Sequence, residues 1–192
     1  GVSGAGIFSA QFFGKGDYEG QKYTFRFKLY ACLLITAIAC VLFHFLDEPL
    51  ISLYLNDGGS VGNTRLALSY GKEYLAIMIF GLLPFAVSQT YVSTIRETGQ
   101  TFVPMVSGIV TNLVLDYVLI FGAFGAPELG VAGAAIATVI ARYTECLIVV
   151  VWAHRHPDKN PYLIGVYKGL RIPGSILADI FRKGLPLMFN EM

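Results

Sequence analysis

The sequence predicts an all-α integral membrane protein. Of its 192 residues, 55% are hydrophobic and only 14% are charged, and the mean hydropathy is +0.60. A soluble domain of this length could not bury so much apolar surface, whereas a bilayer solvates it. Residues 29–46 and 74–95 contain no Asp, Glu, Lys or Arg, and each run approaches the roughly 20 residues that a spanning helix needs. A buried helix of a soluble protein is the alternative explanation for such runs.

Charge-poor runs define the expected elements in order. We expect a partial helix to about residue 13, spans near 27–46, 70–95, 102–123 and 129–153, and the start of another helix near 184. The apolar residues at either end are too few to span, so we expect the chain to be part of a longer protein. The stretch 154–183 is polar and connects the last span to the residues after 184.

The distribution of Lys and Arg predicts which connections are cytoplasmic. Eleven of the fourteen lie in the first, third and fifth connections, whereas the second and fourth hold only Arg65 and Lys72. Cytoplasmic connections carry an excess of positive charge, so we expect 154–183 to be cytoplasmic. Within it, apolar residues recur at helical spacing over 172–185 among charged ones, which predicts an amphipathic helix at the membrane surface.

The span at 129–153 is expected to pack closely against its neighbours. It follows a glycine-rich stretch with a proline, 122–133, which favours a sharp hairpin. Small residues then recur every four positions, a spacing that lets helix backbones approach closely. The two sets are Gly130, Ala134 and Thr138, and Gly133, Ala137 and Ala141.

Several classes of function find no support in the residues. The three cysteines lie in apolar runs without ligand spacing, so we expect neither a disulfide nor a structural metal. A net charge of +1 without a basic stripe does not indicate a nucleic-acid partner. No GxSxG, HExxH or P-loop motif is present, so we expect no enzyme and no cofactor.

Asp116 is the most informative residue, because it is the only formal charge between Glu97 and Glu128. A carboxylate inside a membrane costs several kcal/mol, and it can escape that cost by taking up a proton or by holding a cation. Asn112 lies one turn earlier on the same face, and Thr138 is expected at a similar depth in the next span. We predict that the three form a site for H⁺ or Na⁺. The alternative is that they are hydrogen-bonding contacts between helices.

Arg142 and Glu145 stand three residues apart in the inner half of the last span. A neutralising pair is the least costly arrangement for two such charges, so we interpret them mainly as structural, with a gating role as the alternative. Gln89 and two further polar residues recur every four positions after Pro84. This row predicts a kinked helix with a polar face toward a cavity, although packing would explain it too.

Three segments in succession resemble the multidrug and toxic compound extrusion (MATE) family. They are STIRETGQTFVPM at 93–105, TNLVLDYVLIFG at 111–122 and PELGVAGAAIATVIAR at 127–142. The first residues, GVSGAGIFSAQFFGKGD, are similar to the end of the family's second helix, and the last, KGLPLMFNEM, to the start of its seventh. The resemblance therefore covers nearly the whole chain.

The resemblance implies a partial six-helix lobe of a twelve-helix, two-lobe transporter. Residues 1–153 would run from the end of helix 2 through helix 6 of the amino-terminal lobe, 154–183 would be the cytoplasmic connector, and 184–192 would begin helix 7. Asn112, Asp116 and Thr138 match the positions of a cation site in this lobe. That site also uses an Asp on helix 1, which would lie outside this chain together with the second lobe.

The function that the resemblance implies is secondary active antiport in the plasma membrane. A cationic or amphipathic organic compound would leave the cell in exchange for H⁺ or Na⁺, with the bilayer, the missing helix 1 and the second lobe as partners. A lipid-linked oligosaccharide flippase is one alternative. It should need many cations facing its cavity, and Arg142 is the only Lys or Arg within an expected span. A membrane scaffold or enzyme without transport is the other.

Overall fold

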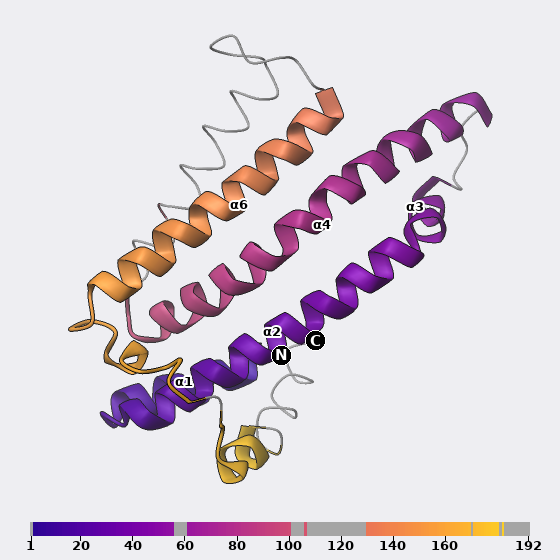
Figure 1. Cartoon of the computed structure of the whole chain (residues 1–192). Coiled ribbons are helices and arrows are strands. Elements are labelled where there is room, and N and C mark those ends of the chain that lie inside the picture. Colours follow the sequence, from indigo (N-terminus) through magenta and orange to yellow (C-terminus); the bar gives the residue numbers. More distant parts are fainter. Residues whose placement is uncertain are drawn as a thin grey trace. The chain divides into compact units, whose positions relative to one another are not determined.

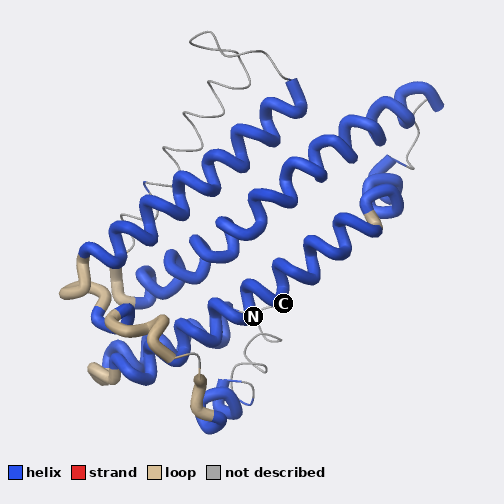
Figure 2. Tube along the Cα trace, viewed as in Figure 1, coloured by secondary structure: helices blue, strands red, loops and turns tan. Residues whose placement is uncertain are grey.

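The computed structural model describes residues 2–55, 61–100, 106, 130–169, 171–180 and 182. Its elements in chain order are α1 (Val2–Gly14), α2 (Tyr18–Phe45), α3 (Asp47–Leu55), α4 (Val61–Glu97), α6 (Gly130–Arg155) and the 3-10 helix η2 (Pro161–Leu163) (Figure 1). Residues 174–180 are helical as well. Only helices and loops occur among the described residues, as Figure 2 shows. The predicted all-α fold is therefore confirmed.

Three of the described helices are long and apolar enough to cross a membrane. They cover Tyr18–Phe45, Leu66–Glu97 and Ala132–Arg155. These helices confirm the spans expected at 27–46, 70–95 and 129–153, and α1 confirms the partial helix expected before residue 14. The span expected at 102–123, with Asn112 and Asp116, lies outside the described residues apart from residue 106, and so do residues 184–192.

Two predicted helix starts are wrong. α2 begins at Tyr18 rather than near 27, and α4 begins at Val61 rather than near 70. The predictions began each helix where the charges stop, but helical backbone continues through charged turns when their side chains find partners. Lys22 pairs with Glu19 at 2.5 Å in the first turns of α2. The residues 47–55, expected as part of a connection, form α3.

Local turn chemistry explains two of the helix ends. Between α1 and α2, Gly16 adopts a positive φ of 70°, and the Asp17 carboxylate accepts a hydrogen bond from the Gly20 amide at 2.9 Å. After α4, Gly99 has a φ of 80°, and the amide of Gln100 donates to the Ile95 carbonyl at 3.2 Å. The second arrangement is a glycine-closed helix end that satisfies carbonyls of the last turn.

The helices contribute to two compact units. The first takes in described residues of 1–34, 86–107 and 146–192, and the second those of 35–85 and 108–145. The first unit contains a buried core in which the rings of Phe25 and Tyr91 meet edge to face at 5.0 Å. In the second unit many apolar side chains stay exposed, such as Phe80 at 70%. Exposed apolar rings on a spanning helix are what contact with lipid requires.

Candidate functional site

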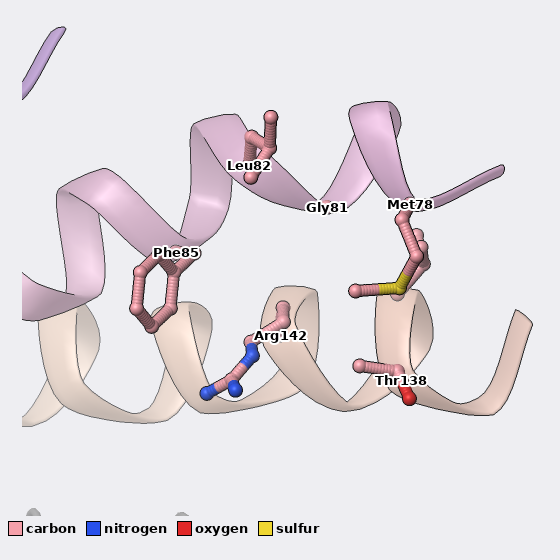
Figure 3. A pocket seen from close by; sticks show the side chains of 7 residues that line it. Met78, Gly81, Leu82, Phe85, Thr138 and Arg142 are labelled. Atoms are coloured by element: carbon pink, nitrogen blue, oxygen red, sulfur yellow. The ribbon is translucent and has the colours of Figure 1, made fainter. Parts of the chain in front are cut away.

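A small cavity lies between α4 and α6 inside the second unit (Figure 3). Its volume is about 140 Å³, a size comparable with apolar cavities that hold one aromatic ring. Among the described residues, the lining is apolar except for one hydroxyl and one guanidinium. The lining residues are Met78, Gly81, Leu82 and Phe85 of α4 and Thr138, Val139 and Arg142 of α6.

Close approach of the two helices frames this cavity. A Cβ placed on Gly81 would lie 3.2 Å from Cγ2 of Val139 and 3.6 Å from its Cα, so only glycine lets α6 come this near to α4 without adjustment. The small residues of α6 behave as predicted in one of the two sets, because Gly133, Ala137 and Ala141 are buried. The residue of α6 that meets Gly81 is nevertheless Val139, outside both sets.

Arg142 is the charged group of the cavity. Its Cζ atom lies 4.7 Å from the centroid of the Phe85 ring, a cation–π contact that Figure 3 shows across the two helices. Its Nη1 lies 3.3 Å from Oε2 of Glu145, and the two side chains are 29% and 9% exposed. The structure thus contains the expected ion pair, with the guanidinium spread between a carboxylate and an aromatic face. A gating role stays a prediction.

Thr138 lies one helical turn before Arg142 on the same cavity wall. Its hydroxyl donates to the carbonyl of Ala134 at 2.9 Å, which leaves the Oγ1 lone pairs free to accept. Asn112 and Asp116, its predicted partners, lie outside the described residues. The cation site of these three residues therefore stays a prediction.

The polar row on α4 consists of Gln89, Ser93 and Glu97, and the described contacts of the last two are with helices of the protein. Glu97 binds a lysine of α2, and the Ser93 hydroxyl donates to the Thr90 carbonyl of its own helix at 3.1 Å. Gln89 is half-buried in the first unit and is not among the residues that line the cavity. α4 continues through Pro84 as one helix.

A second ion pair was missed by the sequence analysis. Nζ of Lys28 in α2 lies 2.5 Å from Oε1 of Glu97 at the end of α4, binds Oε2 as well, and reaches Oγ1 of Thr94 at 3.4 Å. The two charged side chains are 0% and 15% exposed. Sequence spacing gives no sign of this pair, because its partners lie 69 residues apart. The expectation that Arg142 is the only Lys or Arg within a span is therefore wrong, because Lys28 lies within α2.

α1 packs against this second pair through a glycine. A Cβ at Gly6 would lie 2.6 Å from Oε1 of Glu97, closer than a Cβ carbon approaches another heavy atom without a shift. The carboxylate therefore occupies the space that a side chain at position 6 would need. The pair consequently links three helices of the first unit, and nothing in local sequence spacing could have indicated this.

The described residues define the chemistry that this region can perform. The described part of the chain contains no cluster of three or more His, Cys, Asp or Glu that could hold a metal ion. The cavity can hold a small apolar or aromatic group beside a guanidinium whose charge is partly neutralised. The cavity thus has the features of a binding surface inside a membrane. The apolar spans and their ion pairs define the class of the protein, a polytopic α-helical membrane protein whose spans carry paired charges.

Comparison with known proteins identifies the family. The chain belongs to the MatE family, whose model matches residues 2–122, and the predicted resemblance is thereby confirmed. A probable multidrug resistance protein NorM from Thermotoga maritima is 32% identical over 145 residues, which are 73% of this chain and 29% of that protein. A protein of the same description from Agrobacterium fabrum is 30% identical over 181 residues, covering 93% of this chain and 37% of that protein.

Two further comparisons agree. The multidrug export protein MepA from Staphylococcus saprophyticus is 26% identical over 186 residues, covering 95% of this chain and 38% of that protein. A solved structure described as an inward-facing conformation of a multidrug resistance MATE family transporter of the MOP superfamily matches the fold, with a TM-score of 0.74 and 23% identity over 96% of this chain and 40% of that chain. The chain thus spans less than two fifths of the length of these curated relatives.

Proposed function

We propose that this chain is part of a secondary active antiporter that exports organic compounds, cationic or amphipathic, in exchange for H⁺ or Na⁺. Membership of the MatE family carries the proposal, since relatives over most of this chain are described as multidrug resistance or export proteins. The apolar spans support a place in a membrane, and we propose the plasma membrane. The protein would act on its substrate by transport, without enzymatic chemistry.

The coupling site we propose consists of Asp116, Asn112 and Thr138. Asp116 would exchange a proton or bind Na⁺, with Asn112 and Thr138 supplying further oxygens. The free lone pairs of the Thr138 hydroxyl support its part in this site. Ion and substrate must favour different conformations, because a ligand shifts a conformational equilibrium only by its difference in affinity for the two states.

The cavity beside Arg142 suits part of an amphipathic substrate, because its lining combines apolar side chains with a hydroxyl and a guanidinium. Its volume of about 140 Å³ would accept one ring or a short alkyl segment, not a whole drug-sized molecule. We propose that it receives the apolar end of the substrate, and that the Arg142–Glu145 pair gates access to it. The remaining contacts would come from residues of the longer protein.

The flippase alternative is weakened by the partners of the charges. Such a protein needs cations that are free to bind phosphate. Two described cations that lie within the spans are both bound to carboxylates, Lys28 to Glu97 and Arg142 to Glu145. The expectation of a single cation within the spans is wrong, but because both of these cations are paired with carboxylates, an antiporter is still preferred over a flippase.

Asp116→Asn in the full-length protein tests the proposal. In proteoliposomes with an imposed proton or sodium gradient, we expect this variant to fold and insert normally but to lose gradient-driven efflux of a fluorescent organic cation. Asp158→Asn, which changes an exposed carboxylate after α6, is the matched control and should transport normally. Wild-type efflux by the Asp116→Asn variant would contradict the proposal. A membrane scaffold should tolerate Asp116→Leu, whereas a coupled antiporter should lose its efflux in this variant.

A further inference from the structure

The residues that follow α6 fold into the core of the first unit. We call residues 156–169 the strap. Its side chains Tyr162, Leu163 and Val166 are 0%, 6% and 2% exposed and belong to the same buried cluster as residues of α2, α4 and α6. The ring of Tyr162 lies 5.8 Å from that of Phe25 in α2. A polar connection that served only as a tether would not bury such side chains.

Arg26 of α2 binds the backbone around the strap. Its Nε donates to the Val166 carbonyl at 2.7 Å, Nη1 to the Arg171 carbonyl at 3.2 Å and Nη2 to the Gly165 carbonyl at 3.4 Å. The side chain is buried, with the residue 8% exposed. The planar fork of arginine can serve three carbonyls at once, which the single ammonium of lysine cannot do in the same geometry.

Asn160 fixes the other end of the strap to α6. It is fully buried, and its Nδ2 donates to the carbonyl of Ala153 in the last turn of α6 at 3.4 Å and to that of His156 at 3.2 Å. Its Oδ1 accepts from the Tyr162 hydroxyl at 3.3 Å. Burial raises the pKa of Tyr162 above its ordinary value, so the hydroxyl keeps the proton that this bond needs.

Tyr167 attaches the last part of the strap to α4 and α6. The hydroxyl of Tyr167 is hydrogen-bonded to that of Tyr91 in α4, and its ring is stacked on His154 of α6 with centroids 6.0 Å apart. α2, α4 and α6 therefore each hold the strap, through a guanidinium, a hydroxyl and a helix end respectively.

We propose that Arg26 is a positioning residue that fastens the strap, so that residues 156–169 move with the first unit as one body. The docking itself depends only on the described contacts. Its consequence rests on the proposed function: in a transporter, the residues that follow the strap would move relative to this unit from a point beyond the strap rather than from the end of α6. A displacement of the residues that follow the strap would then be transmitted through the strap to α2 and α4.

Hydrogen exchange of the full-length protein in lipid nanodiscs tests the docking. The amides of residues 163, 164, 166 and 168 donate hydrogen bonds within the strap, so their exchange reports whether it is ordered. In Arg26→Gln we expect these amides to exchange at least about tenfold faster than in the wild type, because local opening sets their protection. Arg26→Lys should restore part of the protection.

Arg155→Gln is the matched control. It removes the same charge from an exposed residue at the end of α6, and it should leave exchange of the strap unchanged. Unchanged exchange in Arg26→Gln, or an equal rise in Arg155→Gln, would overturn the proposal. If Arg26→Gln does not fold, Asn160→Ala gives the same test from the other end and should raise exchange of the same four amides.

Efflux measured on the same variants tests the consequence. We expect Arg26→Gln to slow transport several-fold, with Arg26→Lys between it and the wild type. Faster exchange with unchanged efflux would overturn the role in transport. The result with Asp116→Asn does not bear on the exchange measurement, so failure of the proposed function and failure of the docking can be told apart.

Discussion

Two ion pairs of the described spans differ in how they join a cation to a carboxylate. Lys28 and Glu97 lie 69 residues apart in sequence and join α2 to α4, with side chains 0% and 15% exposed. Arg142 and Glu145 lie three residues apart on α6, with side chains 29% and 9% exposed. The first pair belongs to the unit that contains the buried core, and the second lies beside the cavity.

The difference shows what each pair can contribute. A pair between helices that is removed from solvent on both sides constrains packing, because losing either partner strands a charge. A pair within one helix contributes only a few tenths of a kcal/mol to helix stability. Since Arg142 is not fully enclosed, its guanidinium remains available to the Phe85 ring and to a molecule in the cavity.

The largest expected effect comes from Lys28→Met in the full-length protein. Removing the ammonium leaves the Glu97 carboxylate without its cation in a largely desolvated place, and breaking a buried pair in this way typically costs about 3–5 kcal/mol. We expect a correspondingly large fall in stability, measured by thermal unfolding in detergent micelles.

Two controls sharpen this result. Lys22→Met removes a lysine from the same helix whose partner Glu19 is 66% exposed, and it should leave the unfolding temperature nearly unchanged. The double variant Lys28→Met with Glu97→Leu should recover most of the lost stability, because it removes both charges. A double variant as unstable as the single one would show that the pair is not the cause.

Gly6→Ala should give the next largest effect. The added methyl group would meet Oε1 of Glu97 at 2.6 Å and force the carboxylate away from Lys28, at a cost of about 1–3 kcal/mol. Gly14→Ala in the same helix is the control, since a Cβ there meets nothing within 4 Å. Equal unfolding temperatures of the two variants would mean that α1 does not confine the carboxylate.

Tyr162→Phe tests an uncharged contact of the first unit. The change leaves the buried Oδ1 of Asn160 without its donor and should cost about 1 kcal/mol at neutral pH. Because the folded-state pKa of Tyr162 is raised, its contribution is fully present below the ordinary value of 10.0 and is lost as the pH rises from there through the raised value. The stability difference between wild type and variant should thus shrink in alkaline buffer. A constant difference would argue against this tyrosine as the titrating group.

Glu145→Gln should have the smallest effect, about 0.5 kcal/mol or less. The variant removes a partner on the same helix, while the guanidinium of Arg142 keeps its contact with Phe85 and its partial exposure. A loss of stability as large as that of Lys28→Met would remove the distinction between the two pairs. Thermal unfolding under the same conditions makes the comparison direct.

The predicted cation site rests mainly on the sequence, because two of its three residues lie outside the described part of the chain. Asp116 stands out because one charge in a long apolar run is visible without any partner. Helical spacing and depth then point to Asn112 and Thr138, and the family resemblance matches all three positions. The structure adds the hydrogen bond from Thr138 to Ala134, while the other two residues lie outside the described part of the chain.

The fold class, the three described spans and the family could all be predicted from the amino-acid sequence. Each depends on local properties, since the length of an apolar run and the scarcity of charge decide whether a helix can cross a bilayer. The start of α6 could be placed closely because glycine and proline mark it, whereas α2 and α4 extend through charged turns that look like connections.

The partners of the buried charges became known from the packing of the helices. Lys28 meets Glu97, and Arg26 meets the carbonyls around the strap, across separations of 69 residues and more. The cavity likewise has walls from two helices, where Gly81 of α4 lies close to Val139 of α6. Such contacts depend on the rotation and separation of packed helices, and the residues near each partner in sequence do not encode these quantities.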